Sequence, residues 1–332
     1  MKQTQAFLST YTADVSGVCS ALFELGGMTV MHDASGCNST YNTHDEPRWY
    51  DMDSLVYISG LSELEAVMGD DEKLISDVSD AARQLHPRFI ALAGTPIPMI
   101  TGCDLPAIAR EVAGRTNIPS FAVPSNGIGT YVAGAGQALR LYAERFITSR
   151  PEKRKNAVNI LGATPLDFSV NGCVQSMARR IEEAGFTLQS VFAMSSSIDA
   201  IDKAGAAEAN LVISSVGLPA AKYLQAQFGT PYVIGAPFGD FFSPYVFDAL
   251  RESIRTGVPT DVLGAFAPDA PDTIILGESV TAKSLAAALA VGYGIGARVI
   301  CPVEAPGGVL GACDLQLEDE EEIEEALRGA RR

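Results

Sequence analysis

The 332-residue sequence lacks several short motifs that are typical of particular enzyme classes. It has no G-x-x-x-x-G-K-S/T, so we expect that this chain does not bind and hydrolyse ATP itself. It also has no G-x-S-x-G and no H-E-x-x-H, and none of its three histidines has an obvious nucleophile partner, although Ser/His/Asp chemistry stays open. No C-x-x-C pair occurs among the six cysteines, so the spacing excludes a self-contained zinc ribbon.

Basic residues and long apolar runs are scarce as well. The formal net charge is −16, from 40 acidic and 24 basic residues, which argues against a nucleic-acid partner or an anionic membrane surface. The longest apolar candidate, residues 285–297, is short and interrupted by glycine, so we expect no membrane span. The first residues contain no long apolar run of a secretory signal. We therefore expect a cytoplasmic protein with reduced thiols, which are available as metal ligands.

The sequence does contain short β-rich runs that alternate with amphipathic helical segments. Several of these runs are continuously apolar, as in strands that are buried on both faces of a parallel sheet. Alternation of this kind predicts an α/β fold of tandem Rossmann-like, doubly wound parallel-sheet domains. The expected strands are 29–31, 54–58, 89–93, 120–123, 158–161, 187–192, 211–214, 232–234, 273–276 and 297–301, and the expected helices are 70–84, 105–116, 135–148, 173–184, 219–228, 244–256, 282–291 and 319–328.

Two proline-bearing stretches divide the chain. The first, TSRPEKRKN at 148–156, is polar and basic, and the second, 259–271, contains three prolines. A new strand is expected directly after each of them. We therefore expect an N-terminal α/β domain at 1–150, a second Rossmann-like domain at 151–260 and an abbreviated third α/β domain at 261–332.

A glycine-rich stretch, NGIGTYVAGAG at 126–136, follows an expected strand and opens an expected helix. It does not match G-x-G-x-x-G, because Val132 occupies the sixth position from Gly127. A tight strand-to-helix turn is therefore favoured over a dinucleotide site.

The residues most suited to chemistry follow the first expected strand. The apolar run at 28–31 leads into HDASGC, which puts His32 and Cys37 at one edge of the first sheet, and open α/β sheets bind ligands at such an edge. The loop that follows holds His44 and Asp45, which would supply general acid–base groups if burial shifts their pKa values. Two alternatives stay open: a buried structural cysteine with a hydrogen-bonded histidine, and a surface or subunit-contact loop.

Four segments resemble one family, component 1 of nitrogenase and its relatives, which include dark-operative protochlorophyllide reductase and nickel-sirohydrochlorin diamide reductive cyclase. HDASGC resembles the family's H-G-P-x-G-C, and LSELEAVMGDDEKLISDV at 61–78 resembles its E-x-x-x-V-x-G-G-E-x-x-L. A strand–loop–helix at 86–112 resembles a cysteine-bearing segment, and 156–186 with 209–239 resemble the second domain. The likeness extends over residues 10–240 and is looser beyond.

The resemblance implies that Cys37 ligates an iron–sulfur cluster at a subunit interface, with His32 beside the cluster or acting as a proton donor. The family's next cysteine falls on Pro96, and Cys103 follows seven residues later, so Cys103 and Cys19 are candidate ligands only in a rearranged site. Iron–sulfur clusters commonly take four thiolates, more than one such chain supplies. The resemblance therefore implies a 4Fe–4S cluster that bridges two chains, in a homodimer or with a related partner subunit.

We accordingly expect a nitrogenase-like oxidoreductase component. It would take electrons from a separate ATP-dependent iron–sulfur reductase protein and relay them through the bridging cluster to a substrate. Ser214 falls near the family cysteine that holds the large cofactor of nitrogenase, and serine is a poor substitute for a thiolate on iron. The substrate would then be a different one, such as a tetrapyrrole. Two alternatives stay open: a scaffold or maturation protein that holds a metal cluster or tetrapyrrole, and a binding module without a cluster.

Replacing Cys37 by alanine is expected to abolish retention of the cluster, because the family motif supplies this thiolate. Cys313→Ala removes a cysteine that we assign to structure, and this variant should keep its iron. Iron and sulfide analysis of both variants, purified without oxygen, tests the assignment. Equal iron content in the two proteins would overturn it.

Overall fold

The computed structural model describes residues 12–34, 36, 46–266, 271 and 273–328. Cys37, His44 and Asp45 lie outside the described residues. The described chain divides into two compact units: residues 12–141 with 164–170, and residues 142–163 with everything from 171 onward. The division into three domains at 150 and 260 stays a prediction.

The first unit is built on a four-stranded parallel sheet with the order β2-β1-β3-β4. Its strands are β1 (Met28–His32), β2 (Leu55–Ile58), β3 (Ile90–Gly94) and β4 (Ser120–Val123). In the register of β1 with β3, His32 lies opposite Gly94. The strand order reverses between these two strands, and parallel sheets bind ligands outside the carboxyl ends of their strands at such a point. The sheet therefore places the end of β1 at the edge where parallel sheets bind ligands.

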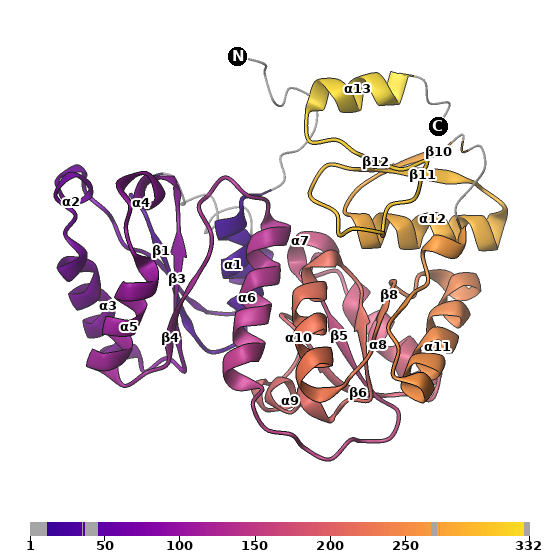
Figure 1. Ribbon diagram of the computed structural model, residues 1–332, viewed down its shortest axis with the longest axis horizontal. Coiled ribbons are helices and arrows are strands. Elements are labelled where there is room, and N and C mark those ends of the chain that lie inside the picture. The colour runs from indigo at the N-terminus through magenta and orange to yellow at the C-terminus, as the bar shows by residue number, and fades with distance from the viewer. Residues whose placement is uncertain (1–11, 35, 37–45, 267–270, 272, 329–332) are drawn as a thin grey trace. The chain divides into compact units, whose positions relative to one another are not determined.

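Helices cover both faces of this sheet. α3 (Asp71–Leu85) and α5 (Leu105–Thr116) lie on one face, and α1 (Asp14–Leu22) and α6 (Tyr131–Phe146) lie on the other (Figure 1). The buried side chains of α3 recur at helical spacing and pack, together with those of α5, against Met28 and Val30 of β1 and Ile90 and Leu92 of β3. These strand residues alternate along the chain, so one core fixes the register of both strands.

The glycine-rich stretch at 126–136 forms the predicted tight turn after β4 and then the first residues of α6, which begins at Tyr131 rather than at 135. The Asp14 carboxylate accepts hydrogen bonds from the backbone N–H groups of Asn126 (2.9 Å) and Gly127 (2.8 Å). A Cβ atom on Gly134 would lie 1.9 Å from the backbone oxygen of Asp14, and one on Gly17 would lie 2.3 Å from that of Tyr131. Glycine is thus required where α1 and α6 approach each other most closely.

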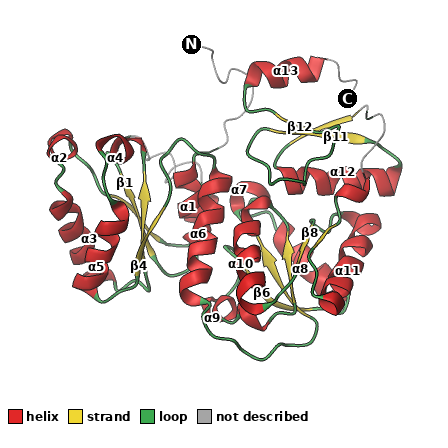
Figure 2. Cartoon of the chain, viewed as in Figure 1, coloured by secondary structure: helices red, strands yellow, loops and turns green. Residues whose placement is uncertain are grey.

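The second unit contains two further parallel sheets, drawn as yellow strands among red helices in Figure 2. Their strand orders are β6-β5-β7-β8-β9 and β10-β11-β12. The strands are β5 (Ala157–Leu161), β6 (Thr187–Val191), β7 (Ala209–Val212), β8 (Tyr232–Ile234), β9 (Thr260–Asp261), β10 (Thr273–Leu276), β11 (Ala297–Cys301) and β12 (Leu315–Gln316). The longer helices are α8 (Cys173–Glu183), α10 (Leu218–Phe228), α11 (Gly239–Thr256), α12 (Ser279–Tyr293) and α13 (Glu320–Arg328).

One buried carboxylate joins these two sheets. Glu278, which is 3% exposed, precedes α12 and accepts a hydrogen bond from the N–H of Val280 (3.0 Å). The same carboxylate accepts the N–H of Ser215 (3.1 Å), which follows β7. Ser284 of α12 accepts the N–H of Ala236 (2.8 Å), which follows β8. These bonds fix α12 against the carboxyl edge of the five-stranded sheet.

The parallel α/β architecture confirms the fold predicted from the sequence. Every strand expected from the sequence is present; β9 and β12, with two residues each, were not expected. α11 begins at Gly239 rather than at Pro244, which lies inside the helix. The sequence pattern missed α1, because every residue of this helix is buried and no polar face gives it a helical period. No helix in the described ranges has the length and apolar character needed to cross a membrane.

A buried ion-pair network fixes the chain where it returns after the undescribed segment 37–45. The Arg48 guanidinium lies 2.7 Å from the Glu46 carboxylate and 2.9 Å from that of Glu24. It also donates to the backbone oxygen of Ser20 in α1 (2.7 Å) and lies over the Phe23 ring, 4.5 Å from its centroid. The network attaches residues 46–50, including the short 3-10 helix η2 (Pro47–Tyr50), to α1.

We expect Arg48→Met to lower the free energy of unfolding by about 3 kcal/mol, because it leaves the buried Glu46 carboxylate without its cation. Arg83→Met removes an exposed ion pair with Asp80 and should change that free energy by about 1 kcal/mol or less. Urea denaturation of the two variants measures both values. Similar losses in the two variants would contradict the role assigned to the network.

Candidate functional site

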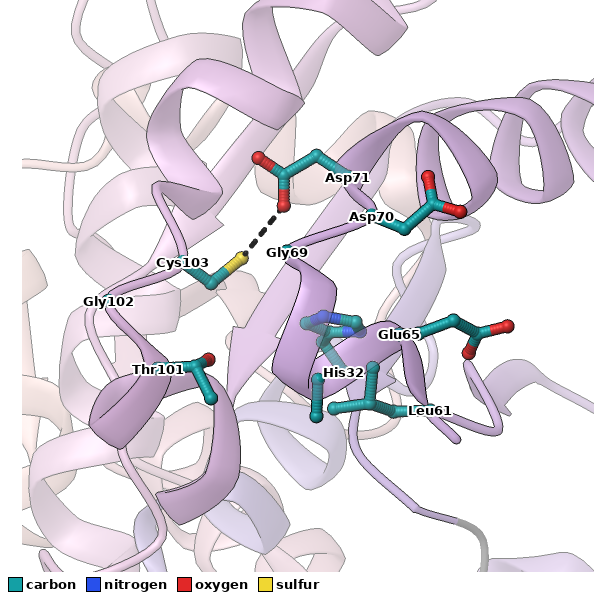
Figure 3. Close-up of a pocket in the computed structure, with 10 residues that line it drawn as sticks. His32, Leu61, Glu65, Gly69, Asp70, Asp71, Thr101, Gly102 and Cys103 are labelled. Atoms are coloured by element: carbon teal, nitrogen blue, oxygen red, sulfur yellow. Dashed lines mark hydrogen bonds between the residues drawn. The ribbon is translucent and has the colours of Figure 1, made fainter. Parts of the chain in front are cut away.

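A pocket of about 100 Å³ lies at the carboxyl edge of the first sheet (Figure 3). His32, at the end of β1, contributes to one wall. The short helix α2 (Glu63–Met68) and the turn that leads into α3 contribute a second, and the end of α4 (Pro96–Thr101) contributes a third. The lining residues are His32, Leu61, Glu65, Ala66, Gly69, Asp70, Asp71, Thr101, Gly102 and Cys103.

Local sequence signals place these walls. α2 begins with a capping box in which the Ser62 hydroxyl accepts the Glu65 N–H and the Glu65 carboxylate accepts the Ser62 N–H. It ends at Gly69, with φ +69°, and Asp70 then caps α3. Gly102, with φ +76°, ends α4 in the same left-handed conformation. Both turns require this conformation, and together they bring Asp71 and Cys103 to the pocket.

His32 is 7% exposed, and a hydrogen-bond network determines which ring nitrogen faces the pocket. The Ser59 hydroxyl donates to the backbone oxygen of Asp33 (3.3 Å), and it accepts the Asp33 N–H (3.1 Å). The Ser59 hydroxyl has one proton, and we assign this proton to the Asp33 oxygen; the 2.9 Å contact between Ser59 Oγ and His32 Nδ1 is then donation from Nδ1–H. His32 Nε2 then carries a lone pair, and it has no hydrogen-bond partner among the described residues.

Burial lowers the pKa of His32, although the nearby charges of Asp71, Asp33 and Glu65 oppose this shift. The lowered pKa favours the neutral ring at neutral pH. In this arrangement the ring accepts a hydrogen bond at its pocket side. The proton-donor role implied by the family resemblance would need a different protonation state, and that role stays a prediction.

Cys103 is the described cysteine that lines the pocket. Its thiol donates to the Asp71 carboxylate at 3.8 Å, as the dashed line in Figure 3 marks. Burial, reinforced by the charges of Asp71 and Asp104, raises the pKa of Cys103 to about 12. The sulfur is therefore a thiol at neutral pH in the structure as described, and a metal ion would have to displace its proton.

Cys19 lies in a different environment. It is 0% exposed within α1, and burial, followed by the charge of Glu46, raises the pKa of its thiol far above the ordinary range. The pocket lining includes Cys103 and not Cys19. The sheet thus brings His32 and Cys103 together, and the ligand role of Cys19 stays a prediction that its burial does not favour.

Among the residues that the structure describes, no three His, Cys, Asp or Glu side chains gather closely enough to hold a metal ion. The described residues alone therefore do not make up an iron–sulfur site, and the ligand role of Cys37 stays a prediction. Sequence reasoning missed Asp71 and Glu65 as pocket residues. Their signal was present in the segment 61–78, where a capped short helix ends in Gly-Asp-Asp.

Ser214, the residue near the family's cofactor cysteine, is fully buried after β7. Its hydroxyl accepts the Val216 N–H (3.4 Å), so the side chain caps the 3-10 helix η4 (Ser215–Gly217). This local role gives the serine a structural function of its own.

An apolar surface adjoins the pocket. Leu64, Val67 and Met68 of α2 are exposed, and no residue of α2 is buried. Met99 and Ile100 of α4 are also exposed, and α2 contacts α4. Exposed apolar side chains that gather in this way are typical of a surface that binds another protein.

Comparisons with known proteins agree with this architecture. The protein NifE of nitrogenase iron-molybdenum cofactor biosynthesis from Methanosarcina barkeri is 28% identical over 196 residues, which are 55% of this chain and 42% of that protein. A light-independent protochlorophyllide reductase subunit from Nostoc punctiforme is 35% identical over 181 residues, which are 52% of this chain and 36% of that protein. The chain thus spans less than half the length of these relatives.

A solved structure of nitrogenase Cp1 at pH 5 has the same fold, with a TM-score of 0.65 at 16% identity, covering 98% of this chain and 72% of that one. The family model described as nitrogenase component 1 type oxidoreductase matches residues 16–280, which is most of the chain. The chain therefore belongs to the nitrogenase component 1 type oxidoreductase family.

Proposed function

We propose that this chain is a reductase component that receives electrons, one at a time, from an ATP-dependent iron–sulfur protein. The electrons pass through an iron–sulfur cluster held between two chains to a substrate. Such a cluster supplies one-electron chemistry. The observation that carries the proposal is the position of β1, which ends at His32, five residues before Cys37, at the sheet edge where Cys103 lies.

The described residues hold the chain in place before and after the segment that contains Cys37. The Arg48 network attaches the chain to α1 directly after the segment that contains Cys37, His44 and Asp45. Ser59 and the end of β1 hold the chain before that segment. The described residues on both sides of that segment are thus held by buried or partly buried hydrogen bonds.

The partner is supported by two features. The chain has no phosphate-binding motif of its own, so ATP would be hydrolysed on another protein. The exposed apolar side chains of α2 and α4 offer a surface beside the pocket on which that protein would dock.

The substrate is proposed to be a tetrapyrrole. Ser214 stands near the family position of the thiolate that holds nitrogenase's large cofactor, and a serine hydroxyl is a weak ligand for iron. A relative that covers about half of this chain is a protochlorophyllide reductase subunit. These observations favour a substrate of that class over dinitrogen.

A second candidate is a scaffold that holds a cluster or cofactor during its assembly and releases it without turnover. The likeness to NifE, which is named as a cofactor biosynthesis protein, favours this candidate. Anaerobic turnover with the reductase protein, ATP and protochlorophyllide separates the two. Product formation supports the reductase, and transfer of iron to an acceptor protein without product supports the scaffold.

For the docking surface we expect Val67→Asp to slow ATP-dependent reduction of the iron-loaded protein about tenfold, because it places a charge on the apolar contact. Reduction by dithionite, which needs no docked protein, should stay unchanged. Stopped-flow absorbance of the cluster measures both rates.

Val258→Asp serves as the matched control, since Val258 is also exposed but lies in the second unit. This variant should keep both rates. An equal loss in the two variants would remove the docking role from α2.

The iron content of the protein tests the cluster itself. Colourless protein that takes up no iron and sulfide would overturn the cluster, and with it both candidate functions. About four irons per dimer would support the cluster.

A further inference from the structure

The hydrogen-bond donors around the pocket are used within the chain. The Thr101 hydroxyl donates to the backbone oxygen of Pro98 (3.3 Å), and the Cys103 thiol donates to Asp71. The Lys73 ammonium, beside the pocket, is paired with Asp77 at 2.9 Å and Glu65 at 3.5 Å. The backbone N–H groups of Leu61, Gly69, Asp70, Asp71, Gly102 and Cys103 all donate to backbone oxygens.

Two acceptors of the pocket, in contrast, are left available. In the tautomer assigned above, His32, more than nine-tenths buried, has a lone pair on Nε2, and no described residue donates to it. Of the donors on described residues, the Asp71 carboxylate accepts only the weak S–H donor of Cys103, on one oxygen. Glu65 and Asp70 add negative charge at the rim, and Lys73 offsets one charge of the three.

An acceptor-lined pocket with net negative charge matches a ligand that is rich in donors and positively charged. Its volume of about 100 Å³ is well below that of pockets for drug-sized ligands, so it would admit a head group and not a whole molecule. We propose that this pocket binds the head of an organic cation, a guanidinium or primary ammonium group, between His32 Nε2 and the Asp71 carboxylate. The proposal does not depend on a cluster or on a redox partner.

Two other ligand classes fit less well. An anion would meet three carboxylates, and the N–H groups of Asp70 and Asp71, the described lining residues at the start of α3, already donate to backbone oxygens. A metal ion finds no set of three His, Cys, Asp or Glu ligands among the residues described. A cation that brings its own fixed N–H donors needs only the two acceptors named above.

Titration of the full-length protein with methylguanidinium chloride tests the proposal. Long-range proton–nitrogen NMR spectra resolve the ring nitrogens of the three histidines. We expect the Nε2 resonance of His32 to start as an unprotonated nitrogen and to shift on binding, while the other histidines stay unchanged. A protonated Nε2 in the free protein, or no shift of His32 up to the concentration at which the protein begins to unfold, would overturn the proposal.

Asp71→Asn should weaken methylguanidinium binding about threefold, as expected for one exposed charge contact. Asp80→Asn, which removes a carboxylate from the same helix outside the pocket, is the matched control and should bind as the wild type does. Equal weakening in both variants would reduce the effect to general electrostatic attraction and overturn the site. An equal response to magnesium chloride at the same ionic strength would do the same.

Two probes distinguish the source of the cation. Methylguanidinium represents a free small molecule, and N-acetylarginine methylamide represents an arginine side chain of a protein. Equal affinities would support a protein side chain as ligand. Binding of methylguanidinium alone would support a free small molecule. Failure of this test leaves the redox proposal standing, because iron content and turnover are measured separately.

Discussion

The parallel pairing of β1 with β3 is the constraint on which the site depends. It places His32 opposite Gly94, at the point where the strand order of the first sheet reverses. A shift of one residue in this register would turn the core-facing Met28 and Val30 to the other face of the sheet, so the core and the site are determined together. The pocket is consequently a product of the same contacts that stabilise the fold.

Much of the architecture was predictable, because parallel strands buried on both faces are recorded in the sequence as short apolar runs. α1 was not predictable in this way, since it is buried on all sides and its close approach to α6 depends on Gly17 and Gly134. The sequence located His32 at the sheet edge from the end of an apolar run. It did not reveal Asp71 as the partner of Cys103, because their contact depends on how two left-handed glycine turns bring separate helices together.

The three cysteines considered as ligands illustrate the limit of reading chemistry from spacing. From the sequence alone, Cys19 and Cys103 are equally plausible as metal ligands. In the structure, Cys19 is buried within α1, whereas Cys103 lines the pocket. Both thiols have raised pKa values through loss of solvent, which holds the proton on sulfur. Cys37 differs from both, because it belongs to a motif that resembles the family's H-G-P-x-G-C.

Glu278 links the two sheets of the second unit, so these sheets are not independent of each other. Its carboxylate serves as the acceptor for the N–H of Ser215, and Ser284 does so for the N–H of Ala236. A shortened chain that stopped before this helix would leave both amides in the five-stranded sheet without these acceptors, at a cost of about 1–3 kcal/mol for each amide that stays buried. The segment from Glu278 onward thus contributes two hydrogen bonds to the end of the preceding sheet, and a deletion at residue 260 would remove both bonds.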